Sequence, residues 1–301
     1  MKIKILLNPY SNRWNSQQRW TEAESALRAT QLDFDLSVSE HADHLVDLAA
    51  DAVRGGYSTL IIAGGDGSVG EVVNGTARGW NEKSAFPVTL GILPLGTAND
   101  LADNIGIPRD LASAAKVISN GKTRRVDLGK CNERYFLNNS GAGLEPYVTT
   151  KQEKIKWISG VPRYLVAAVQ GIMDKPTWHA RLEWDDGSYE GPLSLVSIGN
   201  GYRTGGIFFM TPHADPFDGK LTFVHGYRAT RLGLFQALPR AMKPGEGSFV
   251  EMDGMYEIHC THLKIRFDKP SPVHTDGELF DEWLTDLEYK IFPSCVQMLV
   301  P

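Results

Sequence analysis

Up to about Lys122, short apolar runs alternate with stretches whose apolar residues recur at helical spacing. The apolar runs predict strands, and the periodic stretches predict helices. The expected strands are residues 3–7, 32–38, 59–63 and 88–93, and the expected helices are residues 16–29, 43–54, 68–78, 97–104 and 110–119. This alternation predicts a doubly wound, mostly parallel α/β sheet with helices on both faces, in which ligands bind beyond the carboxyl ends of the strands.

From about Arg125 the pattern changes to short alternating strands that turn residues separate. The expected strands are residues 126–129, 135–138, 179–184, 193–199, 221–227, 256–259 and 262–267, and helices are expected only near 152–173 and 230–241. This pattern is typical of a mostly antiparallel β-sandwich. We therefore expect an α/β domain at 1–124 and a β-sandwich domain at 125–301, with the C-terminal end returning to the first domain. The expected active site is the interdomain cleft.

Composition narrows the classes of protein that the chain can be. With 301 residues, 42% of them hydrophobic, it can bury a full core and form two domains. The formal charge of −5 argues against general binding to nucleic acid. Three widely separated cysteines indicate a reducing compartment. No run is long enough to span a membrane, and the first residues fit a strand better than a targeting segment. We expect a cytoplasmic protein that visits the inner face of the membrane.

The turn after the third expected strand carries the clearest chemical signal. Gly64, Gly65, Asp66 and Gly67 end the apolar run, and a helical pattern begins at Ser68. Glycines permit a sharp turn whose N–H groups face an approaching phosphate, and a helix start adds its positive dipole end. No Gly-Lys-Ser/Thr sequence follows, so the turn is not a P-loop. We interpret it as a nucleotide phosphate site that relies on main-chain groups and a metal.

Two blocks of the sequence match the signatures of a known family. One is Gly64 to Ser68 with Glu71, Asn74 and Gly75, and the other is Gly-Ile-Leu-Pro-Leu-Gly-Thr-Ala-Asn-Asp-Leu-Ala at residues 91–102. Shorter matches follow the same order: Asn8-Pro9, Asp127-Leu128-Gly129, Asn200-Gly201 and Asp276-Gly277-Glu278. From Asn8 to Glu278 the chain resembles the diacylglycerol kinase catalytic domain family. That family includes bacterial lipid kinases and the sphingosine and ceramide kinases, and it is more distantly related to NAD kinases.

The resemblance implies that ATP is the phosphate donor and that Mg²⁺ assists. It assigns the following residues to ATP: Asn8, Ser39, Gly64, Gly65, Asp66, Gly67, Ser68, Glu71, Gly96, Thr97, Asn99 and Asp100. Asp66 is the carboxylate best placed to face the metal, since oxygen ligands suit Mg²⁺. From position alone, Thr97 could be a plain helix cap, and Asn99 and Asp100 could lie on a solvated first turn.

The resemblance also implies a general base near the end of the chain. Glu278 would take the proton of a lipid hydroxyl, and Asp276 would help to bind the metal or hold a polar network. Glu278, Asp66 and Asp276 are then the expected catalytic residues, because phosphoryl transfer needs held phosphates, a metal and a base. Without the resemblance, Asp276-Gly277 would be interpreted as an ordinary hairpin turn.

A second, structural Mg²⁺ is expected between residues 215 and 220. By the resemblance, Asp218 gives its carboxylate while Asp215 and Lys220 give main-chain oxygens; an Asp-Gly turn between strands is the alternative. Two departures from the family pattern stand out. Ser68 replaces a threonine and keeps its hydroxyl, whereas Glu145 stands where many relatives have an aspartate, which leaves its role open.

We interpret the chain as an ATP-dependent lipid kinase that phosphorylates a hydroxyl of a diacylglycerol-like lipid at the membrane surface. An NAD kinase-type enzyme and a non-catalytic nucleotide- or lipid-binding protein of the same fold are the rivals. The block at 91–102 and the late Asp-Gly-Glu favour a lipid acceptor, and retention of Asp66, Asp100 and Glu278 argues for catalysis. Trp157 follows Lys154 and Lys156, and this pattern is typical either of a segment at the edge of a membrane or of a solvated helix face. The acceptor lipid and a homodimer stay open.

Overall fold

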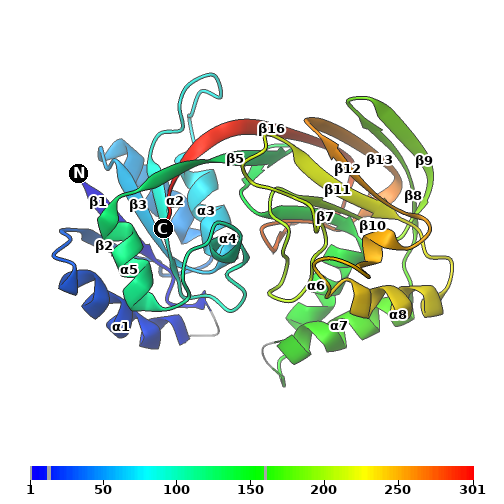
Figure 1. The fold of residues 1–301 in the computed structure, drawn as a ribbon, viewed down its shortest axis with the longest axis horizontal. Coiled ribbons are helices and arrows are strands. Elements are labelled where there is room, and N and C mark those ends of the chain that lie inside the picture. The colour runs from blue at the N-terminus through cyan, green and yellow to red at the C-terminus, as the bar shows by residue number, and fades with distance from the viewer. Residues whose placement is uncertain (1, 12–14, 159–160) are drawn as a thin grey trace. The chain divides into compact units, whose positions relative to one another are not determined.

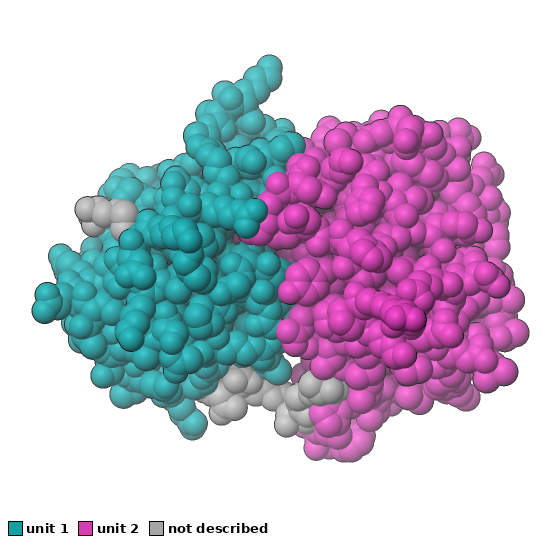
Figure 2. All heavy atoms as spheres, viewed as in Figure 1, with its two compact units in different colours: residues 1–128, 292–301 teal, residues 129–291 magenta. Residues whose placement is uncertain are grey.

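The computed structural model describes residues 2–11, 15–158 and 161–301. The chain divides into two compact units, Met1–Leu128 with Phe292–Pro301 and Gly129–Ile291, which Figure 2 shows in different colours. We call them unit 1 and unit 2. The boundary expected after residue 124 lies inside strand β5 (Thr123–Cys131), and residues 292–301 belong to unit 1.

Unit 1 is built on a parallel sheet with the strand order β2-β1-β3-β4 (Figure 1). The bounds are β1 (Ile3–Leu7), β2 (Asp35–Val38), β3 (Thr59–Gly64) and β4 (Thr89–Pro94). The end of β16 (Leu284–Leu299) adds a further parallel strand, because Met298 pairs with Leu90 of β4. Every residue of β3 is buried, as expected for a strand that helices cover on both faces. The predicted α/β fold is confirmed.

The helices of unit 1 occupy most of the positions that the periodicity predicted. They are α1 (Asn15–Ala29), α2 (His44–Arg54), α3 (Asp66–Thr76), α4 (Asp100–Asn104) and α5 (Leu111–Asn120). Helix α1 packs against α5, and α2 packs against α3. Two predicted starts were wrong: α3 begins at Asp66 instead of Ser68, and α4 begins at Asp100 instead of Thr97.

Unit 2 is a sandwich of two sheets whose strands pair antiparallel. In one sheet the strand order is β12-β11-β10-β7-β14-β15, and in the other β16, β13, β8 and β9 follow one another. The bounds are β6 (Arg134–Phe136), β7 (Asn139–Gly143), β8 (Trp178–Trp184), β9 (Gly187–Leu193), β10 (Leu195–Gly199), β11 (Leu221–Gly226), β12 (Met255–Cys260), β13 (His262–Ser271), β14 (Val273–Thr275) and β15 (Glu278–Leu279).

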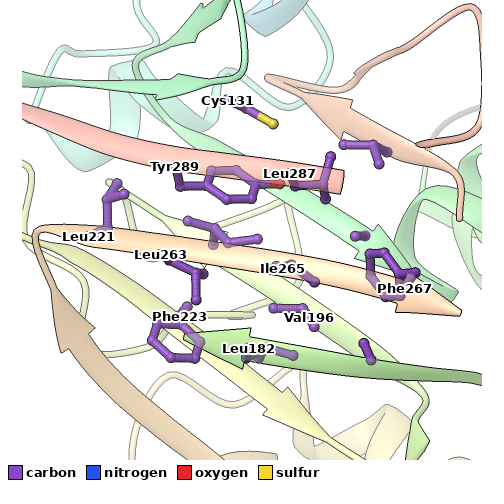
Figure 3. Packing of buried hydrophobic residues seen from close by; sticks show 14 of the residues in the cluster. Cys131, Leu182, Val196, Leu221, Phe223, Leu263, Ile265, Phe267, Leu287 and Tyr289 are labelled. Carbon is purple, nitrogen blue, oxygen red and sulfur yellow. The ribbon is translucent and has the colours of Figure 1, made fainter. Parts of the chain in front are cut away.

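The core of unit 2 lies between these two sheets. Val196 and Phe223 come from one sheet, and Leu182 and Ile265 come from the other (Figure 3). All four are buried, and exposed residues alternate with buried ones along β8. This alternation is the period of two that a strand with one buried face must show. The predicted antiparallel β-sandwich is therefore confirmed.

The helices of unit 2 differ from the prediction. The stretch near 152–173 contains two helices, α6 (Leu144–Lys154) and α7 (Val161–Asp174), and residues 159 and 160 lie outside the described residues. Helix α8 (Arg231–Arg240) and a 3₁₀ turn, η2 (Phe249–Glu251), follow. Among the residues described, no helix is long and apolar enough to cross a membrane.

Candidate active site

Two glycine turns, one after β3 and one after β4, pack directly against each other in unit 1. The N–H groups of Leu95 and Gly96 donate to the carbonyl oxygen of Gly64, at 3.0 and 3.1 Å. A Cβ atom on Gly96 would lie 2.4 Å from the Cα of Gly65, closer than any real contact. Only glycine at position 96 permits this approach of two backbones.

The first glycine turn runs straight into a helix. Gly65 is the N-cap of α3, so Asp66 and Gly67 lie in its first turn. The leading N–H groups of a helix have no partner within the helix, and the helix dipole makes this end positive. A Cβ on Gly64 would come within 2.4 Å of Ser68 Oγ. The turn therefore has the features of an anion site without contributing a lysine.

The first two strands bring two further predicted residues to the same edge of the sheet. Asn8 follows β1, and its Nδ2 donates to Ser68 Oγ at 3.0 Å. Ser39 follows β2, is buried, and donates its N–H to the carbonyl oxygen of Leu7 at 2.9 Å. Because β2, β1, β3 and β4 are neighbours and parallel, their carboxyl ends gather these turns together.

Asp66 and Asp100 supply the acidic groups of this edge. Asp66 Oδ1 accepts the N–H of Leu101 at 3.1 Å, and burial raises the pKa of Asp66 in spite of such hydrogen bonds. Asp100 is buried at the start of α4. Both carboxylates, after the hydrogen bond with Asp103, help to raise the pKa of the Arg109 guanidinium. A buried acid pair of this kind is suited to a cation that arrives with a ligand.

The second glycine turn leads into a helix that begins later than predicted. Asn99 is the N-cap of α4 in a left-handed conformation (φ 53°), and its Nδ2 donates to the carbonyl oxygen of Gly96 at 2.9 Å. Thr97 therefore does not cap a helix; it is exposed in the loop that Gly96 and Asn99 enclose. Asn99 and Asp100 are buried, which argues against the alternative of a solvated first turn, and their assignment to ATP stays a prediction.

Glu71 has a structural contact that the motif did not reveal. Its Oε2 accepts the N–H of Leu45 at 3.2 Å, at the start of α2. A carboxylate at a helix N-terminus satisfies an unpaired N–H and stabilises the dipole. Glu71 thus joins α3 to α2, and an assignment to ATP stays a prediction.

Two arginines beside the glycine turns were not found from the sequence. Arg19 of α1 donates to the carbonyl oxygen of Pro94 at 3.1 Å, and Arg109 donates to the carbonyl oxygen of Ala98 at 2.7 Å. Arg109 also pairs with Asp103 at 2.6 Å. A single basic residue outside the motifs cannot be assigned to the site from one sequence, because only the fold brings it to the carboxyl ends of the strands.

In unit 2, Asp276 and Gly277 form the tight turn between β14 and β15. Both have positive φ, 48° and 86°, and Thr275 pairs with Glu278 across the turn. The backbone here is therefore the Asp-Gly hairpin turn that the sequence offered as an alternative, and the catalytic role of Glu278 stays a prediction. Glu278 follows at the start of β15 with an exposed side chain, while the Arg134 guanidinium donates to the carbonyl oxygen of Leu279 at 3.0 Å.

The Asp276 carboxylate is buried and accepts three main-chain N–H groups. Its donors are Leu137 at 2.9 Å, Asn138 at 2.9 Å and Asn139 at 3.0 Å. Three such bonds fix the orientation of the carboxylate. Asp276 therefore anchors its turn, which carries Glu278, to the start of β7. Its expected part in holding a polar network fits these contacts; a bond to metal stays a prediction.

Glu145, whose role the sequence left open, joins three elements of unit 2. Its carboxylate accepts a hydrogen bond from Ser197 Oγ of β10, and Oε1 lies 3.1 Å from His274 Nε2 of β14. Gly141 of β7 passes so close that a Cβ there would lie 2.8 Å from the Glu145 carboxylate. The buried carboxylate thus positions the strand that leads into Asp276.

The donors available for a metal are oxygen atoms, which is what Mg²⁺ prefers. No cluster of three or more His, Cys, Asp and Glu side chains that could hold a metal occurs in the described part of the chain. Asp66 and Asp100 still fit Mg²⁺ that is bound mainly by nucleotide phosphates, since such ions use one or two protein carboxylates.

At the second predicted metal site, Asp215 and Asp218 accept local main-chain hydrogen bonds. Asp215 Oδ1 accepts from Phe217 N at 3.0 Å, and Asp218 Oδ1 accepts from Lys220 N at 2.9 Å. These contacts define a compact turn before β11. An Asp-Gly turn between strands was the alternative to a structural metal site in this segment. A metal bound there would need main-chain carbonyl oxygens besides the carboxylates.

Comparison with known proteins decides the family. A model of the diacylglycerol kinase catalytic domain matches residues 2–131, and a model of the YegS C-terminal NAD kinase beta sandwich-like domain matches residues 139–300. A diacylglycerol kinase of Staphylococcus saprophyticus is 30% identical over 289 residues, which are 96% of this chain and 89% of that protein. This chain belongs to the diacylglycerol kinase family. It is a lipid kinase, as the sequence predicted.

Other relatives of the kinase agree with this assignment. A probable YegS-like lipid kinase of Chromohalobacter salexigens is 30% identical over 236 residues, 77% of this chain and 73% of that protein. The crystal structure of a putative diacylglycerol kinase from Bacillus anthracis matches the kinase with a TM-score of 0.81 at 24% identity. That match covers 100% of this chain and 97% of the other, and it shows the same fold.

Proposed function

We propose that the kinase transfers the γ-phosphate of ATP to a hydroxyl of a diacylglycerol-like lipid at a membrane surface. The observation that carries this proposal is the close approach of Gly65 and Gly96 at the N-terminus of α3. A glycine turn that leads into the positive end of a helix is suited to the phosphates of a nucleotide. The named relatives supply the class of acceptor.

ATP is proposed to bind at the carboxyl edge of the parallel sheet in unit 1. Gly64 to Ser68 would hold phosphates with main-chain groups, and Asn8, Ser39 and the turn from Gly96 to Asn99 would border them. Asp66 and Asp100 would hold Mg²⁺ together with the phosphates. The metal supplies positive charge that neutralises the charge developing during phosphoryl transfer. A structural Mg²⁺ at Asp218, with the carbonyl oxygens of Asp215 and Lys220, remains part of the proposal.

Glu278 is proposed as the general base of unit 2. Its exposed side chain follows a turn that Asp276 fixes through three hydrogen bonds. A carboxylate held on a rigid turn can accept a hydroxyl proton as the oxygen attacks the phosphate. Asp276 acts here through the backbone of the turn, which makes it a positioning residue.

The acceptor is tested by supplying labelled ATP to the purified kinase with diacylglycerol, phosphatidylglycerol, sphingosine, ceramide or NAD. We expect phosphorylation of diacylglycerol, dependent on Mg²⁺. Phosphorylation of NAD alone would reject the lipid acceptor, and phosphorylation of sphingosine or ceramide in preference would reject the diacylglycerol class.

The base is tested with Glu278→Gln, which keeps the size of the side chain and removes its basicity. We expect turnover to fall about 10²- to 10⁴-fold while ATP still binds, as for the loss of a general base. Glu282→Gln is the matched control, because Glu282 is an exposed glutamate on the same segment. Turnover of Glu278→Gln near that of the control would exclude Glu278 as the base.

A further inference from the structure

Helix α7 buries one apolar face and exposes further apolar side chains beside it. Ala167, Ala168 and Ile172 are buried against the rest of unit 2. Next to that face, Val169 is 42% exposed and Met173 is 52% exposed, one helical turn apart, while Gln170 and Asp174 are exposed beside them. A helix of a soluble protein ordinarily places polar residues on the face that it does not bury. Val169 and Met173 therefore form an apolar strip on the exposed side of α7 that the helix itself does not cover.

Helix α8 and the segment before α7 carry two further exposed apolar side chains. The Arg231 guanidinium of α8 donates to the carbonyl oxygen of Met173 at 2.8 Å, which brings the start of α8 to the end of α7. The next residue, Leu232, is 67% exposed, and Trp157 between α6 and α7 is 76% exposed. Figure 1 shows α6, α7 and α8 together in unit 2, in agreement with their packing. We call Trp157, Val169, Met173 and Leu232 the apolar patch.

The charge around the apolar patch is opposite in sign to that of the whole chain. Residues 144–177 and 228–247, which form α6, α7, α8 and their flanks, contain nine lysines and arginines against four acidic residues. The whole chain has a net charge of −5, so the excess of positive charge is local. Lys154 and Lys156 are exposed beside Trp157, and Arg240 and Lys243 are exposed at the end of α8.

We propose that the apolar patch and its basic rim are the face with which the kinase docks on a bilayer that contains anionic lipid. Tryptophan and aliphatic side chains partition into the boundary between headgroups and acyl chains, while lysine and arginine interact with anionic headgroups. This proposal adds a membrane-binding surface to the proposed function. It depends on that function only in taking the lipid substrate from the bilayer.

A second copy of the chain is the less suitable occupant of this face. Two-fold symmetry would place the same surface on both partners, so two positively charged rims would meet. The like charges would oppose such a dimer, whereas an anionic bilayer neutralises them. The charge pattern therefore favours the bilayer.

Co-sedimentation with vesicles in the absence of ATP tests docking separately from catalysis. The wild-type kinase is expected to bind phosphatidylcholine vesicles that contain roughly a third phosphatidylglycerol, and to bind pure phosphatidylcholine much more weakly. Met173→Ser with Leu232→Ser is expected to weaken binding by about tenfold or more, since two side chains lose contact with the acyl region. Leu36→Ser is the matched control, because Leu36 is 39% exposed in unit 1.

The basic rim is tested with Lys154→Gln and Lys156→Gln together, which should weaken binding to anionic vesicles by about tenfold or more and reduce its salt dependence. Lys83→Gln, an exposed lysine of unit 1, is the control. Turnover of a dispersed short-chain diacylglycerol should remain at the wild-type level in every docking variant, which separates docking from folding and chemistry.

The outcomes distinguish the two proposals. Unchanged vesicle binding in both docking variants overturns the docking face, whatever the enzyme phosphorylates. A shift from dimer to monomer in Met173→Ser with Leu232→Ser, with vesicle binding intact, assigns the face to a second copy and also overturns it. Normal docking without phosphorylation of any lipid supports the docking face and rejects the proposed function.

Discussion

His274 Nε2 lies 3.1 Å from Glu145 Oε1, although 129 positions separate the two residues in the sequence. The other ring nitrogen of His274, Nδ1, is buried and has no hydrogen-bond partner among the described residues. A carboxylate only accepts, so Nε2 is the nitrogen that carries the proton. This contact ties the start of α6 to the strand that continues into Asp276 and Glu278.

Glu145→Gln is expected to destabilise the kinase by about 2 kcal/mol, because the amide accepts more weakly than the carboxylate from Ser197 and His274 at a part-buried position. It should also lower kcat, since β14 carries the turn before Glu278, while the KM for ATP stays unchanged. Thermal unfolding and steady-state kinetics measure the two effects. Glu153→Gln, an exposed glutamate on the same helix, should change neither; an equal effect of both substitutions would contradict the positioning role.

Asp276→Asn should affect stability more strongly. An amide oxygen can replace only part of the acceptor capacity of a carboxylate that binds three N–H groups, so we expect a loss of about 2–4 kcal/mol. Turnover should fall as well, because the Asp-Gly turn loses its anchor on β7. Denaturant unfolding and the kinase assay check this result, with the exposed Asp281→Asn as the control. A variant as stable as that control would show that the three hydrogen bonds contribute little.

Gly96→Ala tests the contact between the two glycine turns. The added methyl group would overlap the backbone of Gly65, and such overpacking costs about 3 kcal/mol. We expect the variant to lose ATP binding, which titration with a fluorescent ATP analogue measures. Gly245→Ala adds the same methyl group in open space and should bind ATP normally. Normal ATP binding by Gly96→Ala would mean that the turns can separate at little cost.

His225 should make the stability of unit 2 depend on pH. Its ring stacks on Phe223 and Tyr256 and lies against Tyr189, and burial lowers the pKa of His225 to about 4. The unfolded chain takes up this proton near pH 6.5, but the folded protein does so only near the lower value. Stability contributed by neutral His225 is therefore complete above about pH 6.5 and falls by up to about 3 kcal/mol as the pH drops to about 4.

Urea unfolding at about pH 7 and about pH 5 measures this dependence. His225→Phe removes the titrating group and should flatten the fall in stability between the two pH values. His179→Gln, at an exposed histidine, should leave the fall as it is in the wild type. A wild-type slope in His225→Phe would mean that other groups cause the dependence.

The regular elements were predictable because their patterns were local. Strand β3 is a continuous apolar run, and β8 alternates strictly, so each showed its own burial in the sequence. Strand β7 did not, since Asn-Ser-Gly-Ala-Gly has low strand propensity and becomes a strand only because β10 and β14 enclose it. Strand β16 was missed because Pro293 interrupts its pattern.

The same distinction holds for the site. The glycine turns could be predicted from the sequence, because consecutive glycines directly after an apolar strand indicate a tight turn. The anchoring of Asp276 and the contacts of Glu145, Arg19 and Arg109 were not readable. Each depends on partners from distant segments, and the residue types alone do not show which partner the fold will supply.

Residues 292–301 complete a unit whose other residues all precede position 129. Val296, Met298 and Leu299 are buried there, and Leu299 packs where Gly91 leaves room in β4. During synthesis on the ribosome, one edge of β4 in unit 1 therefore stays uncovered until the whole of unit 2 has been made. The sheet of unit 1 is therefore complete only after the last residues have been synthesised, and the first half of the chain alone cannot form it in full.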